Sequence, residues 1–200
     1  MEAHTFRAAT IFGAERARGP PAEAGKAEAI RYKGKKLKDI LDAHEKFHKG
    51  HPGGERAELA GADLSGADLQ KRDLTGANLA GANLSRADLR WAKLSHADLS
   101  HTDLRRADLR NCDFTETCLE GADLSEADLS GTELFRGDLR SAKLHKTILR
   151  GTVLRQANVR GADFSGSDLA LASFREIDLT GVKLDGADLK DAVVRDIRRP

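Results

Sequence analysis

The chain has 200 residues, with 33 Lys and Arg against 32 Asp and Glu and a formal net charge of +1. This length allows one domain with a core, and the balanced charge argues against direct nucleic-acid binding and against an anionic membrane as partner. Aromatic residues make up only 4% of the chain, and no apolar run approaches the ~18 residues of a membrane-spanning helix. Its two cysteines make no disulfide framework. These features together predict a cytoplasmic protein without membrane contact.

Residues 1–25 are expected to form a disordered tail. They contain Gly19-Pro20-Pro21 and show no apolar period. Their longest apolar stretch, residues 8–14, is interrupted by Thr10 and Gly13 and does not resemble a secretory segment. The tail belongs to a basic part of the chain, because residues 1–54 carry 11 basic and 7 acidic groups.

Residues 26–54 are predicted to form a helical cap and linker. Within them, residues 35–49 show one apolar stripe at helical spacing, and Gly50 with Pro52 should end the helix. The stripe consists of Leu37, Ile40, Leu41, His44 and Phe47. A solenoid exposes apolar side chains and unpaired backbone at each end. We therefore expect this helix to cover the first coil of the repeat that follows.

Three histidines of this segment have a spacing that could present nitrogen ligands to a metal. His44, His48 and His51 lie at positions i, i+4 and i+7. The sequence places no cysteine or paired carboxylate with them. Packing within the cap is the alternative role, and we expect no metal and no cofactor.

Residues 55–200 carry an internal repeat with a period of five. A large apolar residue recurs at every fifth position from Leu59 to Val194, which makes 28 units without an insertion or deletion. A small residue precedes it by two positions, Asp or Asn usually stands between them, and Gly often closes the unit, as in Ala62-Asp63-Leu64 followed by Gly66.

A period of five fits neither an α-helix nor a plain strand. Five residues advance about 500° around a helix, and an odd spacing alternates between the faces of a strand. A chain that turns once per unit points every central residue at a shared axis. Gly, Asn, Asp and Ser at the corners accept the required turns.

This pattern resembles the A-[D/N]-L-X-X units of the pentapeptide-repeat family, and the resemblance covers residues 57–194. It implies an all-β solenoid, a right-handed quadrilateral parallel β-helix with four units per coil, here preceded by the N-terminal α-helical cap. About seven coils at ~4.8 Å would give a rod roughly 34 Å long. Residues twenty apart should then stack on one another.

Stacking by twenty places six aspartates in one outward row, interrupted by Ile148. Such a ladder could hold cations, but Asp at this position of the repeat could equally bond backbone amides at the corner. The row comprises Asp68, Asp88, Asp108, Asp128, Asp168 and Asp188.

A candidate partner-binding patch combines arginines with apolar residues at outward positions. Ile148 and Val153 stand where the repeat normally has Asp, and Phe135 precedes an arginine row on one side of the rod. Exposed aromatic, aliphatic and Arg side chains are typical of interface centres, although drift in a degenerate repeat gives the same pattern. The candidate residues are Phe135, Arg136, Ile148, Val153, Arg155 and Arg175. Trp91 and Leu171 are expected to project outward elsewhere on the rod.

The C-terminal end of the rod is a candidate dimer contact. Only six residues follow Val194, too few for a useful capping helix, so the last coil would expose apolar side chains. A second copy packed end to end across a two-fold axis would cover them. Val193, Val194 and Ile197 would lie in that contact, with Arg198 and Arg199 at its rim.

The sequence predicts a binding function and not an enzyme. No nucleophile motif, phosphate loop or acid–base pair is present, and a filled solenoid lacks a concave pocket. The first hypothesis is a protein-interaction module or scaffold. The alternative, suggested by the resemblance, is a DNA-mimicking protein that binds DNA gyrase, as in quinolone resistance. A mimic should be strongly acidic, whereas residues 55–200 carry 22 basic against 25 acidic groups.

Overall fold

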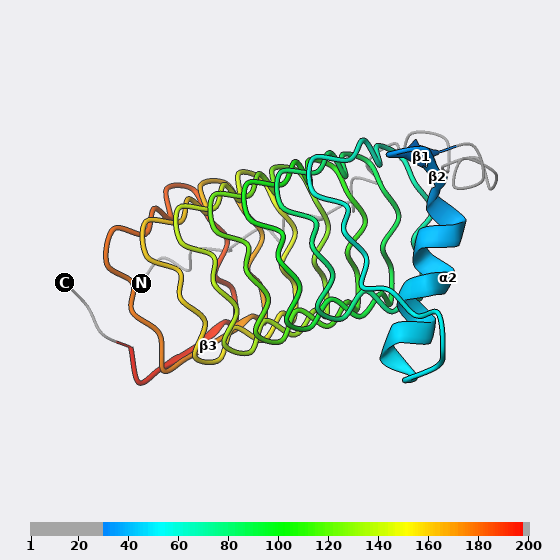
Figure 1. Cartoon of the computed structure of the whole chain (residues 1–200). Helices are drawn as coiled ribbons and strands as arrows, with labels where there is room; N and C mark the ends of the chain where they lie inside the picture. Colours follow the sequence, from blue (N-terminus) through cyan, green and yellow to red (C-terminus); the bar gives the residue numbers. More distant parts are fainter. Residues whose placement is uncertain (1–29, 198–200) are drawn as a thin grey trace, which may run out of the picture.

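The computed structural model describes residues 30–197 of the chain. The tail predicted over residues 1–25 lies outside the described residues, as do Arg198 and Arg199. The described part begins with a short hairpin and a helix and continues as a long rod of stacked coils (Figure 1). The hairpin comprises β1 (Arg31–Tyr32) and β2 (Lys35–Lys36), and the helix is α2 (Leu37–His48).

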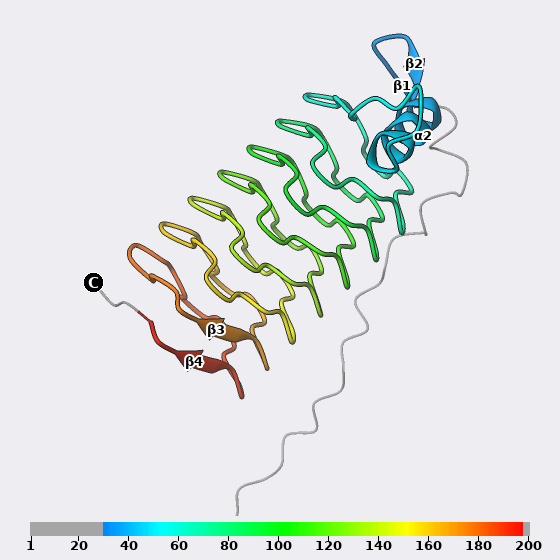
Figure 2. The ribbon, with the colours of Figure 1, turned by 60° about the horizontal axis from the view of Figure 1, so that its bottom comes forward.

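The rod is a four-sided parallel β-helix in which each coil takes twenty residues. Every bridge along it is parallel and joins residues twenty apart, from Glu58↔Asn78 at one end to Asp168↔Asp188 near the other. Three backbone hydrogen bonds typically tie each side to the next coil, as in Leu79 N to Asp98 O at 2.8 Å. Figure 2 shows the resulting stack of coils. On most sides the two stacked units share a bridge of a single residue pair. A longer parallel pairing, of three residue pairs, occurs within the described chain only at its far end, between β3 (Ser173–Arg175) and β4 (Val193–Arg195).

The core consists of the central residues of the repeat, as predicted. All of them from Leu59 to Phe174 are buried, and the smaller residue two positions earlier is buried with them in nearly every unit. Thr at this small position keeps its hydroxyl paired: the Oγ1 of Thr117 donates to Leu94 O at 2.7 Å. A buried hydroxyl with a partner carries no large penalty, which explains why Thr can replace Ala here.

Helix α2 packs against the first coil. Leu37 and Leu41 are buried and belong to the same apolar core as Leu59, and the backbone amide of Ala57 donates to His44 Nδ1 at 3.1 Å. The predicted apolar stripe is wrong at one residue, because Phe47 is 49% exposed. The last turn of α2 still contacts the rod, because His48 bonds the carbonyl of Thr75.

Two further sequence predictions have an outcome here. The helix was predicted over residues 35–49, but Lys35 and Lys36 belong to β2, so it begins at Leu37. The hairpin itself was missed. Among residues 30–197 no helix is long and apolar enough to cross a membrane.

Candidate interaction surface

The side of the rod built on Leu134 and Leu154 carries the candidate patch. Phe135 projects from it, half-buried, and two guanidinium groups lie against its ring. The guanidinium carbon of Arg136 is 4.9 Å from the ring centroid and that of Arg155 is 5.9 Å away. Both distances lie within the range of cation–π attraction. The structure therefore brings together three residues that the sequence could place only on one side of the rod.

Both guanidinium groups are also held by polar partners on neighbouring coils. Arg155 contacts Glu176 Oε1 at 3.2 Å, and Arg136 donates to Gln156 Oε1 at 3.0 Å. A hydrogen bond from Gln156, together with the charge of Arg155, lowers the pKa of Glu176. Arg136 also lies 3.6 Å from Glu116. Each arginine beside Phe135 therefore has a polar partner of its own on a neighbouring coil.

Apolar side chains continue from Phe135 around the next corner of the rod. Val153 is 39% exposed on the same side, and Ile148 is half-buried on the preceding side, where it replaces Asp in the row between Asp128 and Asp168. The corner between Ile148 and Val153 is Gly151.

Leu171 lies on this same corner, one coil further on. It stands twenty residues after Gly151, and the amide of Gly151 donates to the adjacent Ala170 O at 3.1 Å. Leu171 is 61% exposed. The expectation that it projects elsewhere on the rod is therefore wrong, because Leu171 adjoins the patch. We call the set Phe135, Ile148, Val153 and Leu171, with Arg136 and Arg155, the corner surface.

The remaining predicted residue, Arg175, adjoins this set, whereas Trp91 lies apart from it. Arg175 is exposed on the same side as Arg155, one coil on, and pairs in β3 with Arg195 of β4. Trp91 is 58% exposed on the same corner as Leu171 but four coils earlier.

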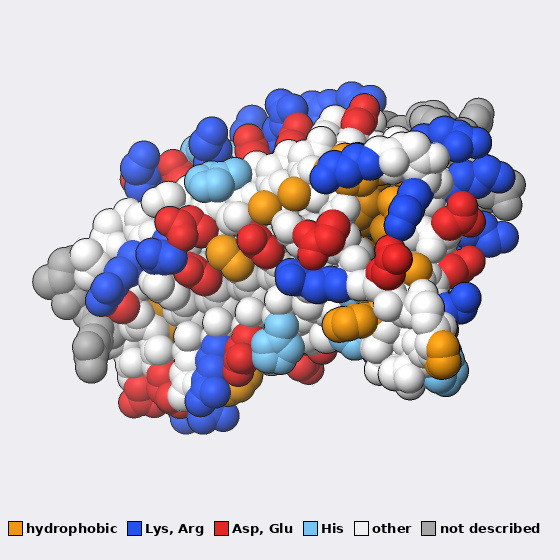
Figure 3. Space-filling view, in the orientation of Figure 1, with side chains coloured by type: hydrophobic (Ala, Val, Ile, Leu, Met, Phe, Trp, Pro, Cys, Tyr) orange, Lys and Arg blue, Asp and Glu red, His pale blue; other side chains and the backbone are white. Residues whose placement is uncertain are grey.

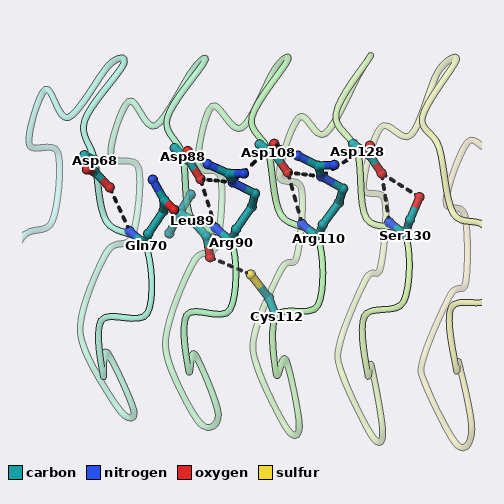
Figure 4. Close-up of polar contacts among 10 residues, drawn as sticks. All are labelled: Asp68, Gln70, Asp88, Leu89, Arg90, Asp108, Arg110, Cys112, Asp128 and Ser130. Carbon is teal, nitrogen blue, oxygen red and sulfur yellow. Dashed lines mark hydrogen bonds and ion pairs between the residues drawn. The ribbon is translucent and has the colours of Figure 1, made fainter. Parts of the chain in front are cut away.

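The aspartate row bonds backbone and arginine groups. Figure 4 shows that Asp88 and Asp108 each accept a hydrogen bond from the backbone amide two residues later. The following arginines, Arg90 and Arg110, then bind the same carboxylates, the closest contacts being 2.7 and 2.6 Å. The prediction that Asp at this position bonds corner amides is confirmed. Within residues 30–197 no three His, Cys, Asp or Glu side chains are grouped to hold a metal ion.

The histidines of α2 contribute to packing. His44 is fully buried, and its Nδ1 accepts the Ala57 amide, so the proton of the neutral ring resides on Nε2. His48 lies edge-on, with 4.8 Å between the ring centroids, and bonds the carbonyl of Thr75. Burial, and then the neighbouring His48, lowers the pKa of His44.

Burial disfavours the thiolate form of both cysteines. Cys112 occupies a small inward position, as predicted, and its thiol donates to Leu89 O at 2.9 Å. Burial raises its pKa to about 12. Burial also raises the pKa of the half-buried Cys118.

The last described coil exposes its apolar residues. Leu189, Val193 and Val194 are 41%, 41% and 43% exposed, and Leu184 and Ile197 are half-buried. Strand β4 pairs with β3 on one side, and no described strand pairs with its other edge.

Comparisons with known proteins agree with this architecture. The family model described as pentapeptide repeats matches residues 57–95, 92–131, 133–170 and 160–196. No curated protein matches the chain in sequence.

Similar solved structures include HetL, a pentapeptide-repeat protein involved in heterocyst differentiation regulation from Nostoc sp. strain PCC 7120. It is 32% identical over 68% of this chain and 82% of its own, with a TM-score of 0.36. Rfr23 from Cyanothece 51142 is 26% identical over 61% and 90%, with a TM-score of 0.43. A trypsin-treated variant of QnrB1, a plasmid-mediated fluoroquinolone resistance protein, is 26% identical over 73% and 86%, with a TM-score of 0.34.

Proposed function

Because this chain belongs to the pentapeptide-repeat family, whose members form right-handed quadrilateral β-helices, we propose that it is a non-catalytic protein-interaction module. The proposed binding site is the corner surface. The observation that carries the proposal is the exposure of Leu171 and Val153, at 61% and 39%, on the side of the rod where two guanidinium groups contact the ring of Phe135. We propose that residues 26–54 cap a rod of about seven coils that comprises residues 55–200.

The composition of the corner surface also supports this function. Aromatic and Arg side chains with an aliphatic centre are enriched where protein interfaces are most strongly stabilised. Arg136 and Arg155 are already bonded to their neighbours. Binding a partner would therefore cost little additional side-chain entropy at these two residues.

Affinity capture with matched variants tests this site. The double change Val153→Asp and Leu171→Asp should leave the fold intact, because both side chains are exposed, and should remove the partner that the wild type binds. The control adds the same two charges on another side, as Ser100→Asp and Thr180→Asp, and should retain that partner. Equal capture by all three proteins would contradict the proposal.

We further propose that the C-terminal coil end forms a homodimer through Val193, Val194 and Ile197. The exposure of Val193 and Val194 and the unpaired edge of β4 among the described residues support it. Two such ends packed face to face would shield both apolar coil sections.

The charge distribution of the rod supports the DNA-mimic alternative less well than it supports a protein-interaction module. A mimic of duplex DNA needs rows of uncompensated anions, whereas Asp88 and Asp108 are bonded to Arg90 and Arg110. A supercoiling assay with purified gyrase and a fluoroquinolone separates the two functions. Protection of gyrase would favour the mimic, and unchanged inhibition would favour the interaction module.

A cytoplasmic location stays a prediction.

A further inference from the structure

The β1–β2 hairpin is the most strongly basic part of the described chain. Residues 30–38 contain five Lys and Arg and no Asp or Glu. All five side chains are exposed. Figure 3 shows Lys and Arg side chains gathered over the end of the molecule where β1, β2 and the start of α2 lie. The five are Arg31, Lys33, Lys35, Lys36 and Lys38.

Many arginines of the rod form ion pairs with carboxylates, whereas four of these five cations do not pair with any carboxylate of the described chain. Along the rod, six arginines contact an aspartate within 2.7 Å; they are Arg90, Arg105, Arg110, Arg140, Arg150 and Arg160. In the hairpin, Lys35 pairs with Glu55 at 2.9 Å. Arg31, Lys33, Lys36 and Lys38 form no ion pair with any carboxylate among residues 30–197. Four positive charges are therefore concentrated at one end with no carboxylate partner among the described residues.

Two of these cations have partners inside the hairpin, but none of these partners is an anion. The guanidinium of Arg31 donates to Gly34 O at 3.3 Å, and the ammonium of Lys33 lies 5.1 Å from the centroid of the Tyr32 ring. Arg31 and Lys36 are directly opposite each other across the two strands, where like charges repel. An anionic ligand would reduce this repulsion.

The hairpin presents its unpaired charges outward. Its inner face is attached to the protein, because the hydroxyl of Tyr32 donates to Ala60 O and Lys35 binds Glu55. Alternate residues of a strand point to opposite faces, so Arg31 and Lys36 point away from the rod. Lys33 lies in the turn at the tip.

The geometry favours a nucleic acid over a membrane. Stable membrane attachment needs an apolar anchor in addition to charge, but the apolar residues of this segment are not free to supply one: Leu37 is buried in the core, and Ile30 and Tyr32 pack against it. Contacts to phosphates are sufficient for sequence-independent binding to DNA. A two-stranded ribbon also fits the major groove of B-form DNA, about 12 Å wide.

We propose that Arg31, Lys33 and Lys36 of the hairpin, together with Lys38 at the start of α2, bind the phosphate backbone of duplex DNA without sequence preference. The sequence argued against direct nucleic-acid binding from a net charge of +1, which averages the hairpin with the acidic rod. The hairpin lies at the N-terminal end of the rod, many coils from the corner surface (Figure 1). DNA binding and the proposed protein partner are thus independent of each other.

Fluorescence anisotropy with the full chain and a short, labelled, mixed-sequence DNA duplex tests the proposal. Four phosphate contacts predict a log–log salt slope of up to about −3.6, which is roughly a 100-fold loss of affinity between 50 and 200 mM salt. The variant Arg31→Gln, Lys33→Asn and Lys36→Gln should bind at least about 10-fold more weakly at 50 mM salt, with a slope shallower by about 2.7. Its melting temperature should stay close to that of the wild type, because the relief of the cross-strand repulsion offsets the loss of two exposed contacts, Arg31 with Gly34 O and Lys33 with the Tyr32 ring.

The matched control removes three rod cations, as Arg105→Gln, Arg150→Gln and Arg160→Gln, and should bind duplex DNA within about twofold of the wild type. A second arm measures cosedimentation with phosphatidylcholine vesicles that contain or lack phosphatidylserine, where we expect no binding at physiological salt. The proposal is overturned if the wild type does not bind the duplex at low salt, or if the hairpin variant binds as well as the wild type. Binding to the anionic vesicles in preference to DNA, lost in the same variant, would also overturn it.

Discussion

The same leucine of the repeat should contribute very different amounts of stability at two places in the rod. Leu99 is fully buried in a middle coil, whereas Leu189, at the equivalent repeat position in the last described coil, is 41% exposed. Leu99→Ala removes about three buried methyl or methylene groups, at ~0.8 kcal/mol each. It also leaves an enclosed cavity, so the total loss should be about 3–4 kcal/mol. Leu189→Ala loses part of the transfer term and leaves no enclosed cavity, so we expect about 1 kcal/mol.

Urea unfolding followed by circular dichroism measures both free energies of unfolding. Ser100→Ala is the control for Leu99→Ala, because its side chain lies outside the core and should change stability by less than ~0.5 kcal/mol. Similar losses for Leu99→Ala and Leu189→Ala would refute the burial argument. A large loss for Ser100→Ala would show that the register of the repeat is wrong.

Three other perturbations have defined outcomes. Since the folded-state pKa of His44 is lowered, the unfolded chain takes up the proton first, and stability should fall as the pH drops below about 6.5. The change His44→Gln should flatten that slope in melting curves. Deleting residues 1–25 should leave the melting temperature nearly unchanged, whereas deleting 1–52 should expose the first coil and cause aggregation; a monodisperse shorter fragment would exclude the cap. Sedimentation equilibrium at micromolar concentration should show a dimer that Val194→Asp with Ile197→Asp converts to monomer, and a wild-type monomer would rule out the end-to-end contact.

The fold could be predicted because the repeat period directly encodes burial. A residue such as Leu99 can be buried at a five-residue period only if the chain turns once per unit. The hairpin could not be predicted in the same way, because strands of two residues, Arg31–Tyr32 and Lys35–Lys36, are too short to show any period. Its one local signal was the Lys33-Gly34 pair, a weak variant of the Asn-Gly turn.

The candidate site was only partly predictable. Stacking by twenty placed Phe135 and Arg155 on one side, but the contacts of the two guanidinium groups with the ring depend on side-chain conformations that sequence spacing does not specify. Leu171 was misplaced although the same rule locates it above Gly151, at the corner between Ile148 and Val153. Applying the twenty-residue stacking rule to the corner residues as well as to the residues on the sides would have placed Leu171 next to the patch.

Hydroxyl-radical footprinting of the wild-type chain, with and without its captured partner, tests the corner surface most directly. Trp91 provides an internal reference, because it is 58% exposed on the same corner and four coils away. We predict that the partner suppresses oxidation of Phe135 and Leu171 and leaves Trp91 as reactive as in the free protein. Unchanged oxidation of Phe135 and Leu171 in a saturated complex would contradict the proposed binding surface.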